Sequence, residues 1–189
     1  MYFNFIGMDG SGKDTIANEL LKQLPSLNDI HYLDDKKIME IKEPGGTSAG
    51  EIIRKVLLSK TLTSHYKVIY LEKAMKENIH PRTRLLLNKA IPYVANDDIY
   101  YEVPLFAAAR NELIQKVISP NRDTYSIIGK RSVACSMAYQ AHGRNFEGVW
   151  EINHEIILDG GVPDFEIFID IPAEVAMKRI EHRGNKNRL

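Results

Sequence analysis

The clearest chemical pattern lies near the start of the chain, where a glycine-rich loop fits G-x-x-x-x-G-K. Its residues are Gly7, Met8, Asp9, Gly10, Ser11, Gly12 and Lys13. Glycines let the backbone wrap tightly enough to aim successive N–H groups at one anion. A helix that begins near Lys13 adds the positive end of its dipole, and the lysine can reach the β- and γ-phosphates of a nucleotide. The loop therefore predicts a binding site for the phosphates of a nucleotide rather than a turn without a ligand.

The residue after this lysine departs from the pattern. Asp14 stands where a Ser or Thr hydroxyl normally meets Mg²⁺, and Thr15 follows it. We favour Asp14 as a ligand of Mg²⁺, directly or through a water, because G-K-D-T resembles the loop of some phage deoxynucleotide kinases. Two alternatives stay open. Thr15 could take the metal while Asp14 repels phosphate, or Asp14 could only stabilise the start of the helix electrostatically.

Two pairs of residues further along have the spacing of neighbours on a helix face. Phe106 and Arg110 are four residues apart, so an aromatic ring could stack on a nucleobase while the arginine bonds its carbonyl. Ser136 and Gln140 have the same spacing. A lone phenylalanine on a helix is more often part of the core, but the arginine one turn away favours base recognition.

These residues need elements that position them, and the hydrophobic periodicity predicts strands that alternate with helices. The predicted strands are 2–6, 38–42, 124–128 and 165–169. The predicted helices are 15–24, 48–59, 103–118, 133–142, 147–158 and 173–182. Such alternation is typical of an α/β fold, in which helices cover both faces of a parallel sheet.

Residues 60–104 are less regular, and Pro81 divides two predicted helices there. Residues 67–89 carry a surplus of basic over acidic side chains. We interpret this stretch as a solvated helical pair. A surface for a partner protein, or a lid over the site, is the alternative.

The composition excludes several classes of protein. The 189 residues include 25 Lys and Arg against 25 Asp and Glu, so a dedicated nucleic-acid binder is not expected. One cysteine cannot form a disulfide framework or a cysteine-built zinc site. No stretch is apolar and long enough for a membrane span, and the N-terminus lacks the pattern of a signal peptide. We expect a single cytoplasmic domain over residues 1–189, with no membrane or nucleic-acid partner.

Four later segments resemble the thymidylate kinase family. They are Glu43-Pro44-Gly45-Gly46-Thr47, Phe106-Ala107-Ala108-Ala109-Arg110, Lys130-Arg131 with Ser136-Met137-Ala138-Tyr139-Gln140, and Pro163-Asp164. The resemblance implies a three-layer α/β/α P-loop NTPase fold with a helical insertion around residues 60–104. It also implies transfer of the γ-phosphoryl group of ATP to dTMP, with ATP and Mg²⁺ as cofactors and assembly as a homodimer.

The same resemblance implies roles on the nucleoside side of the site. Phe106, Arg110, Ser136 and Gln140 would contact thymine. Tyr139 would crowd the sugar and disfavour a 2′-hydroxyl, although a half-buried tyrosine with a bonded hydroxyl is the structural alternative.

Further implied roles concern the phosphates. Arg131 would grip the phosphate of dTMP and Asp9 would bind its 3′-hydroxyl, with Glu43 and Arg54 at other acceptor-side positions. Residues 183–189 resemble the start of a lid. Because Gly10 stands where some members carry a catalytic arginine, Arg183 and Arg188 are candidates to neutralise charge on the transferred group, unless they are simply surface arginines.

Two further features depart from the family pattern. Lys130 stands where the family has an aspartate that helps to organise Mg²⁺, and we hypothesise that Lys130 contacts phosphate and pairs with Asp14. The family pattern also continues for about fifty residues beyond the lid, so the chain is a fragment or a shortened form.

Three other functions stay open. The acceptor could be another deoxynucleoside monophosphate, such as dUMP or a modified pyrimidine nucleotide. The chain could also be a catalytically impaired nucleotide-binding homologue, because Asp14 and Lys130 are unusual. Finally, residues 60–104 could make it a partner-docking protein.

Overall fold

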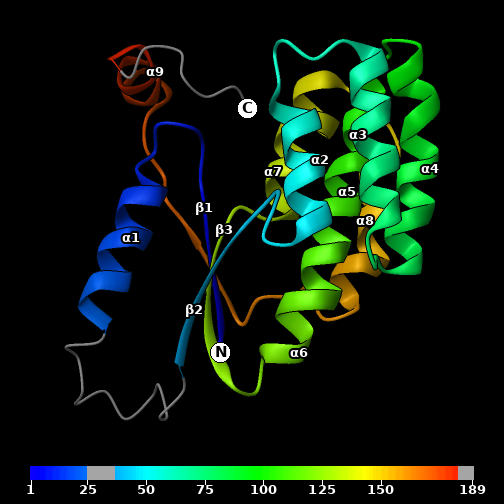
Figure 1. Ribbon diagram of the computed structural model, residues 1–189. Helices are drawn as coiled ribbons and strands as arrows, with labels where there is room; N and C mark the ends of the chain where they lie inside the picture. Colours follow the sequence, from blue (N-terminus) through cyan, green and yellow to red (C-terminus); the bar gives the residue numbers. More distant parts are fainter. Residues whose placement is uncertain (25–36, 183–189) are drawn as a thin grey trace. The chain divides into compact units, whose positions relative to one another are not determined.

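The computed structural model describes residues 1–24 and 37–182 of the chain (Figure 1). The chain divides into two compact units. The first, here called the sheet unit, comprises Met1–Ile41, Asn121–Ser132 and Pro163–Leu189. The second, the helical unit, comprises Lys42–Pro120 and Val133–Val162. A single kinase domain over residues 1–189 stays a prediction.

The sheet unit contains a four-stranded sheet in the order β2-β3-β1-β4. The strands are β1 (Tyr2–Ile6), β2 (Lys37–Lys42), β3 (Tyr125–Lys130) and β4 (Phe165–Phe168). The central strand β1 runs parallel to both neighbours, with Tyr2 opposite Ile127 and Phe3 opposite Phe165. The parallel sheet of an α/β fold, predicted from the alternation of elements, is confirmed.

Two helices of the sheet unit, α1 (Lys13–Gln23) and α9 (Ala173–His182), follow strands directly in sequence. Phe5 and Ile128 of the sheet and Ala17 of α1 form a buried core cluster, with partly buried leucines of α1 packed against it. Burial of this apolar surface holds α1 against the sheet and so fixes the start of the helix beside the end of β1.

The helical unit consists of helices of different length. They are α2 (Ser48–Leu58), α3 (Ser64–Lys76), α4 (Pro81–Ala95), η2 (Ile99–Tyr101), α5 (Glu102–Leu113), η3 (Ile114–Ile118), α6 (Ser119–Asn121), α7 (Val133–Ser136), η4 (Met137–His142) and α8 (Val149–Leu158). Figure 1 shows α3, α4 and α5 side by side. Every residue of α5 except Phe106 is buried, because α2, α4 and α8 all pack around it.

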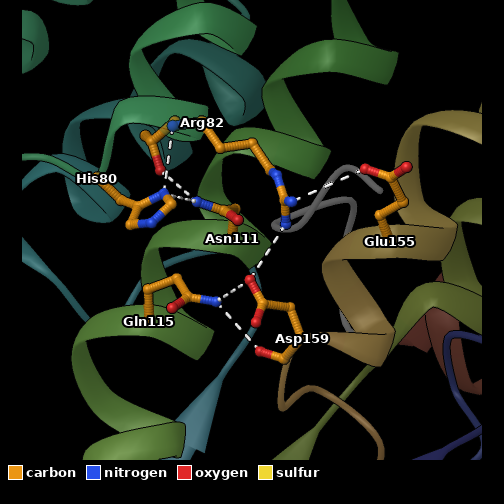
Figure 2. Close-up of polar contacts among 7 residues, drawn as sticks. His80, Arg82, Asn111, Gln115, Glu155 and Asp159 are labelled. Atoms are coloured by element: carbon orange, nitrogen blue, oxygen red, sulfur yellow. Dashed lines mark hydrogen bonds and ion pairs between the residues drawn. The ribbon is translucent and has the colours of Figure 1, made fainter.

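The two helices predicted on either side of Pro81 are confirmed as α3 and α4. The N-terminus of α4 is joined to α5 by polar contacts, which Figure 2 shows. Nδ1 of His80 accepts from the backbone N–H of Arg82 at 3.2 Å, and it lies 3.1 Å from Nδ2 of Asn111. Arg82 also donates to the carboxylate of Asp159 at 3.3 Å. These contacts tie the segment that contains α4 to the core of the helical unit.

Five of the six predicted helices differ from the structure in extent or geometry. Helices 15–24 and 48–59 are observed as Lys13–Gln23 and Ser48–Leu58. The predicted helix 147–158 begins at Val149, because Gly148 has a left-handed φ of 71° and ends the preceding turn. The predicted helices 103–118 and 133–142 each contain a π-helical segment, η3 and η4. Apolar spacing does not separate α-helical from π-helical turns over so few residues.

Over residues 1–24 and 37–182, no helix combines the length and apolar character that crossing a membrane requires.

Candidate functional site

The glycine-rich loop lies between β1 and α1, as its pattern predicts. Gly7, Gly10 and Gly12 have positive φ values of 151°, 82° and 94°. A side chain at Gly10 would place its Cβ 2.6 Å from the carbonyl oxygen of Ala176 in α9. The turn therefore needs glycine both for its backbone conformation and for its close contact with α9.

Lys13 lies at the first position of α1 and is almost completely buried. Its ammonium donates to the carbonyl oxygen of Met8 at 3.3 Å and to Oδ1 of Asp9 at 3.5 Å. The charged end is thus folded back over the loop. Asp14 and Thr15, the next two residues, are exposed in the first turn of α1, so both alternatives for a metal ligand are accessible to solvent.

Arg131 follows β3 and joins the loop through Asp9. Its Nη2 donates to Oδ1 of Asp9 at 2.9 Å, and its backbone N–H donates to the carbonyl oxygen of Phe5 at 3.0 Å. The residue has a left-handed φ of 74°, which is uncommon for residues other than glycine. Its Nη1 is buried and has no hydrogen-bond acceptor among the described residues. A buried guanidinium donor without a partner is unfavourable unless a ligand supplies the acceptor.

The hypothesis that Lys130 pairs with Asp14 is wrong. Nζ of Lys130 lies 2.5 Å from Oε1 of Glu40 in β2 and 2.5 Å from Oδ1 of Asn18 in α1. The side chain thus bonds to two elements beside its own strand. The sequence separation of these partners, 90 and 112 residues, hides the contact from local patterns.

In the helical unit, Arg110 of α5 is buried and uses all three guanidinium nitrogens. Nε donates to Oε2 of Glu43 at 2.9 Å, and Nη2 donates to Oγ of Ser136 at 3.1 Å. Nη1 donates to Oδ1 of Asn153, whose Nδ2 donates to the carbonyl oxygen of Val149 at 2.7 Å. The structure therefore brings Glu43, Arg110 and Ser136 together and adds Asn153.

Phe106 and Gln140 lie close to this cluster in sequence. Phe106 is on α5 with Arg110, and Gln140 is in η4, which directly follows the α7 helix that ends at Ser136. Phe106 is half-buried and is the one residue of α5 that is not buried, so it is not an ordinary core phenylalanine. Gln140 is buried, and its Nε2 donates to Oε2 of Glu102 at 3.3 Å. The other carboxylate oxygen of Glu102 accepts from Nη1 of Arg144 at 2.6 Å. Tyr139, also in η4, is half-buried.

The Glu43–Thr47 turn is held by residues of α2. Arg54 donates to the carbonyl oxygen of Pro44 at 2.8 Å, and Oε1 of Glu51 accepts from the backbone N–H of Gly46 at 3.0 Å. Oγ1 of Thr47 accepts from the backbone N–H of Gly50 at 2.9 Å and so caps α2. Arg54 therefore supports the turn that carries Glu43 and does not bond to Arg110 directly.

The predicted site residues thus form two groups. The sheet unit holds the loop 7–13 with Asp14, Thr15 and Arg131, and the helical unit holds Glu43, Arg54, Phe106, Arg110, Ser136, Tyr139 and Gln140. Arg183 and Arg188 lie outside the described residues.

Sequence reasoning missed four residues: Glu102, Arg144, Asn153 and Arg179. Arg179 of α9 donates to the carbonyl oxygens of Gly10 and Ser11, both at 3.2 Å. Asn153 shares an i, i+4, i+7 stripe of α8 with the buried residues Val149 and Ile156. A polar side chain on that apolar stripe was a readable signal, whereas nothing local marks Arg179.

Comparisons with known proteins agree on one family. The family model described as Thymidylate kinase matches residues 5–82 and 77–189. The chain is 33% identical over 187 residues to the thymidylate kinase of Thermosipho africanus, covering 97% of this chain and 73% of that protein. It is 32% identical over 194 residues to the thymidylate kinase of Mycoplasma capricolum subsp. capricolum, covering 100% of this chain and 72% of that protein.

A solved structure supports the fold. The crystal structure of thymidylate kinase from Ehrlichia chaffeensis matches with a TM-score of 0.57 at 22% identity, covering 96% of this chain and 82% of that chain. At this identity the likeness concerns the fold alone.

Proposed function

The chain belongs to the thymidylate kinase family, and from this premise we propose that it transfers the γ-phosphoryl group of ATP to dTMP, giving dTDP and ADP. The observation that carries the proposal is the arginine beside the loop. Arg131 bonds to Asp9 through Nη2, while its buried Nη1 lacks an acceptor among the described residues. A phosphate oxygen is a suitable acceptor, because a guanidinium presents paired donors that match it.

The reaction needs no covalent intermediate on the protein. An oxygen of the dTMP phosphate forms the new bond to the γ-phosphorus of ATP, and the bond from that phosphorus to the β–γ bridging oxygen breaks. Positioning and charge neutralisation therefore account for most of the catalysis. The loop amides and Lys13 hold the phosphates of ATP, and Arg131 aligns the acceptor phosphate. Asp9 orients Arg131 and binds the 3′-hydroxyl of the acceptor.

Mg²⁺ fits this site with Asp14 as its protein ligand. The ion usually keeps several waters and takes one or two carboxylates together with substrate phosphates. Asp14 offers an exposed carboxylate in the first turn of α1, whereas Asp9 is already bonded to Arg131 and Lys13. The described residues contain no cluster of three or more His, Cys, Asp or Glu side chains that could hold a metal. When bound, Mg²⁺ would be held by Asp14 and would neutralise negative charge on the phosphates of ATP.

The helical unit supplies the groups proposed to bind the nucleoside. Phe106 stacks on the base. Arg110, Ser136 and Gln140 form hydrogen bonds to it. Glu43 holds Nε of Arg110. Arg54 acts through the turn that carries Glu43, and Tyr139 crowds the sugar.

Several parts of the proposal rest on the resemblance. Arg183 and Arg188 remain candidates to neutralise charge on the transferred group. Assembly as a homodimer, action in the cytoplasm and the lack of a nucleic-acid partner remain predictions of the sequence.

The test is a discontinuous assay with ATP, Mg²⁺ and dTMP in which dTDP and ADP are separated and quantified. We expect dTDP and ADP in equal amounts, with loss of both in Lys13→Ala and no change in Lys22→Ala, which alters an exposed lysine of α1. Faster turnover of dUMP or a modified pyrimidine nucleotide would show that the acceptor is misassigned. Nucleotide binding without dTDP would show an impaired homologue.

A further inference from the structure

Two hydrogen-bonded pairs connect α5 to the α7–η4 segment. Arg110 donates to Ser136, and Gln140 donates to Glu102. Glu102, Phe106 and Arg110 follow each other at four-residue spacing on α5, so they lie along one stripe of the helix. The two pairs therefore bracket Phe106, the one residue of α5 that is not buried.

The pair formed by Glu102 and Gln140 determines which way the amide of Gln140 points. An ionised carboxylate only accepts hydrogen bonds, so the Nε2 side of the amide must face Glu102. Its carbonyl oxygen, Oε1, is consequently directed away from Glu102. The ion pair between Glu102 and Arg144 at 2.6 Å holds the carboxylate in place, and Glu102 is only 8% exposed.

We propose that Glu102, together with Arg144, is a positioning residue that turns the carbonyl of Gln140 toward the nucleobase and so sets the choice of base. The proposal rests on the proposed function, in which Phe106 and Arg110 bind the base. Arg110 then offers a donor and Gln140 an acceptor. Thymine and uracil match this order, because their C4 carbonyl accepts and their N3–H donates. Cytosine has an amino group at C4 and an unprotonated N3, so it presents the opposite order.

The test compares Glu102→Gln with Glu112→Gln. Both substitutions replace a buried carboxylate on α5 by an amide, but Glu112 accepts from the backbone N–H of His80 and has no bond to Gln140. An amide at position 102 can present either its oxygen or its nitrogen, so it no longer selects one orientation of Gln140. For each protein we would measure the dissociation constants and the kcat/KM values of dTMP and dCMP, together with thermal stability.

We expect the preference of kcat/KM for dTMP over dCMP to fall about tenfold or more in Glu102→Gln, in line with the loss of one oriented hydrogen bond. Glu112→Gln should keep the preference for dTMP over dCMP, even if its melting temperature falls as far as that of Glu102→Gln. The inference is overturned if Glu102→Gln keeps the parent preference, or if both variants lose it equally. A parent chain that binds neither nucleotide selectively would overturn the proposed function itself, and this outcome is seen before any variant is made.

A second pair of variants guards against a simple folding defect. Gln140→Glu alone places two carboxylates together and should weaken dTMP binding. Combining Gln140→Glu with Glu102→Gln restores a donor–acceptor pair and leaves an acceptor toward the base. The double variant should therefore recover both the preference for dTMP over dCMP that Glu102→Gln loses and the dTMP affinity that Gln140→Glu loses, and two independent losses would contradict the inference.

Discussion

Arg131 forms a 2.9 Å ion pair with Asp9 of the glycine-rich loop, and the arginine has a left-handed backbone conformation with a φ of 74°. A left-handed residue other than glycine is unfavourable by about 1–2 kcal/mol. Such strain is found where a site requires one particular side-chain position. The pair therefore places the guanidinium at the loop, and its second terminal nitrogen has no hydrogen-bond acceptor among the described residues.

Replacing Arg131 by lysine should raise the KM for dTMP by about tenfold or more. Lysine keeps the positive charge but lacks the planar pair of N–H donors that can form two parallel hydrogen bonds to a phosphate. Steady-state kinetics with varied dTMP would measure the effect. The matched control is Arg122→Lys, which alters an arginine of the sheet unit that pairs with Asp164 at 3.1 Å. Equal kinetics for Arg131→Lys and the parent would contradict the assigned role.

Gly10→Ala should destabilise the chain more than Gly12→Ala. Both glycines have positive φ, so alanine adds strain of about 1 kcal/mol at either position. At Gly10 the new Cβ would also lie 2.6 Å from a backbone oxygen of α9, whereas at Gly12 the nearest atom is an arginine nitrogen at 3.7 Å. We expect an additional loss of about 1–3 kcal/mol for Gly10→Ala from this overlap. Urea unfolding would measure the difference, and equal losses would show that α9 does not confine the loop.

Lys130→Glu should destabilise the chain, and adding Glu40→Lys should recover part of the loss. The single variant places two carboxylates where an ion pair stands. Because Glu40 is 48% exposed, water screens the pair, and we expect a loss of about 1 kcal/mol. A double-mutant cycle by chemical denaturation measures the coupling. In contrast, adding Asp14→Thr to Lys130→Asp should not recover the stability that Lys130→Asp loses. Such a recovery would support the pairing of Lys130 with Asp14, which the structure contradicts.

Asp14→Asn should raise the Mg²⁺ concentration needed for half-maximal rate, since the amide keeps the shape but loses the charge that binds the ion. Asp14→Thr, which restores the usual hydroxyl, should keep substantial activity. The measurement is the initial rate of dTDP formation against Mg²⁺ at saturating nucleotides. An unchanged Mg²⁺ dependence in Asp14→Asn would favour Thr15 as the ligand.

Local patterns predicted the elements of this chain well. The strand 2–6, the loop 7–13 and the helix after it depend on neighbouring residues, so periodicity and glycine spacing were enough. The four-residue spacing of Phe106 and Arg110 correctly placed both on one helix. The same spacing favoured an accessible Phe106 over a core position, but the burial of every other residue of α5 depends on how three other helices surround it.

Contacts between distant segments were beyond sequence reasoning. Lys130 bonds to Glu40, which is 90 residues away, and charge alone suggested Asp14 as its partner instead. Arg110 bonds to Glu43 and Asn153 across 67 and 43 residues. Several acidic and amide side chains of the sequence could have bonded to Lys130 or Arg110, and only tertiary packing determines which of them do.

Transfer of the phosphoryl group from ATP to dTMP is tested most directly by following that group with a label. ATP labelled at the γ-phosphate is mixed with the chain, Mg²⁺ and dTMP, and the labelled products are separated. We predict that the label passes to dTDP, and that neither labelled dTDP nor labelled inorganic phosphate forms with Lys13→Ala. Label that appears only as inorganic phosphate, or that stays in ATP while dTMP binds, would contradict the proposed transfer.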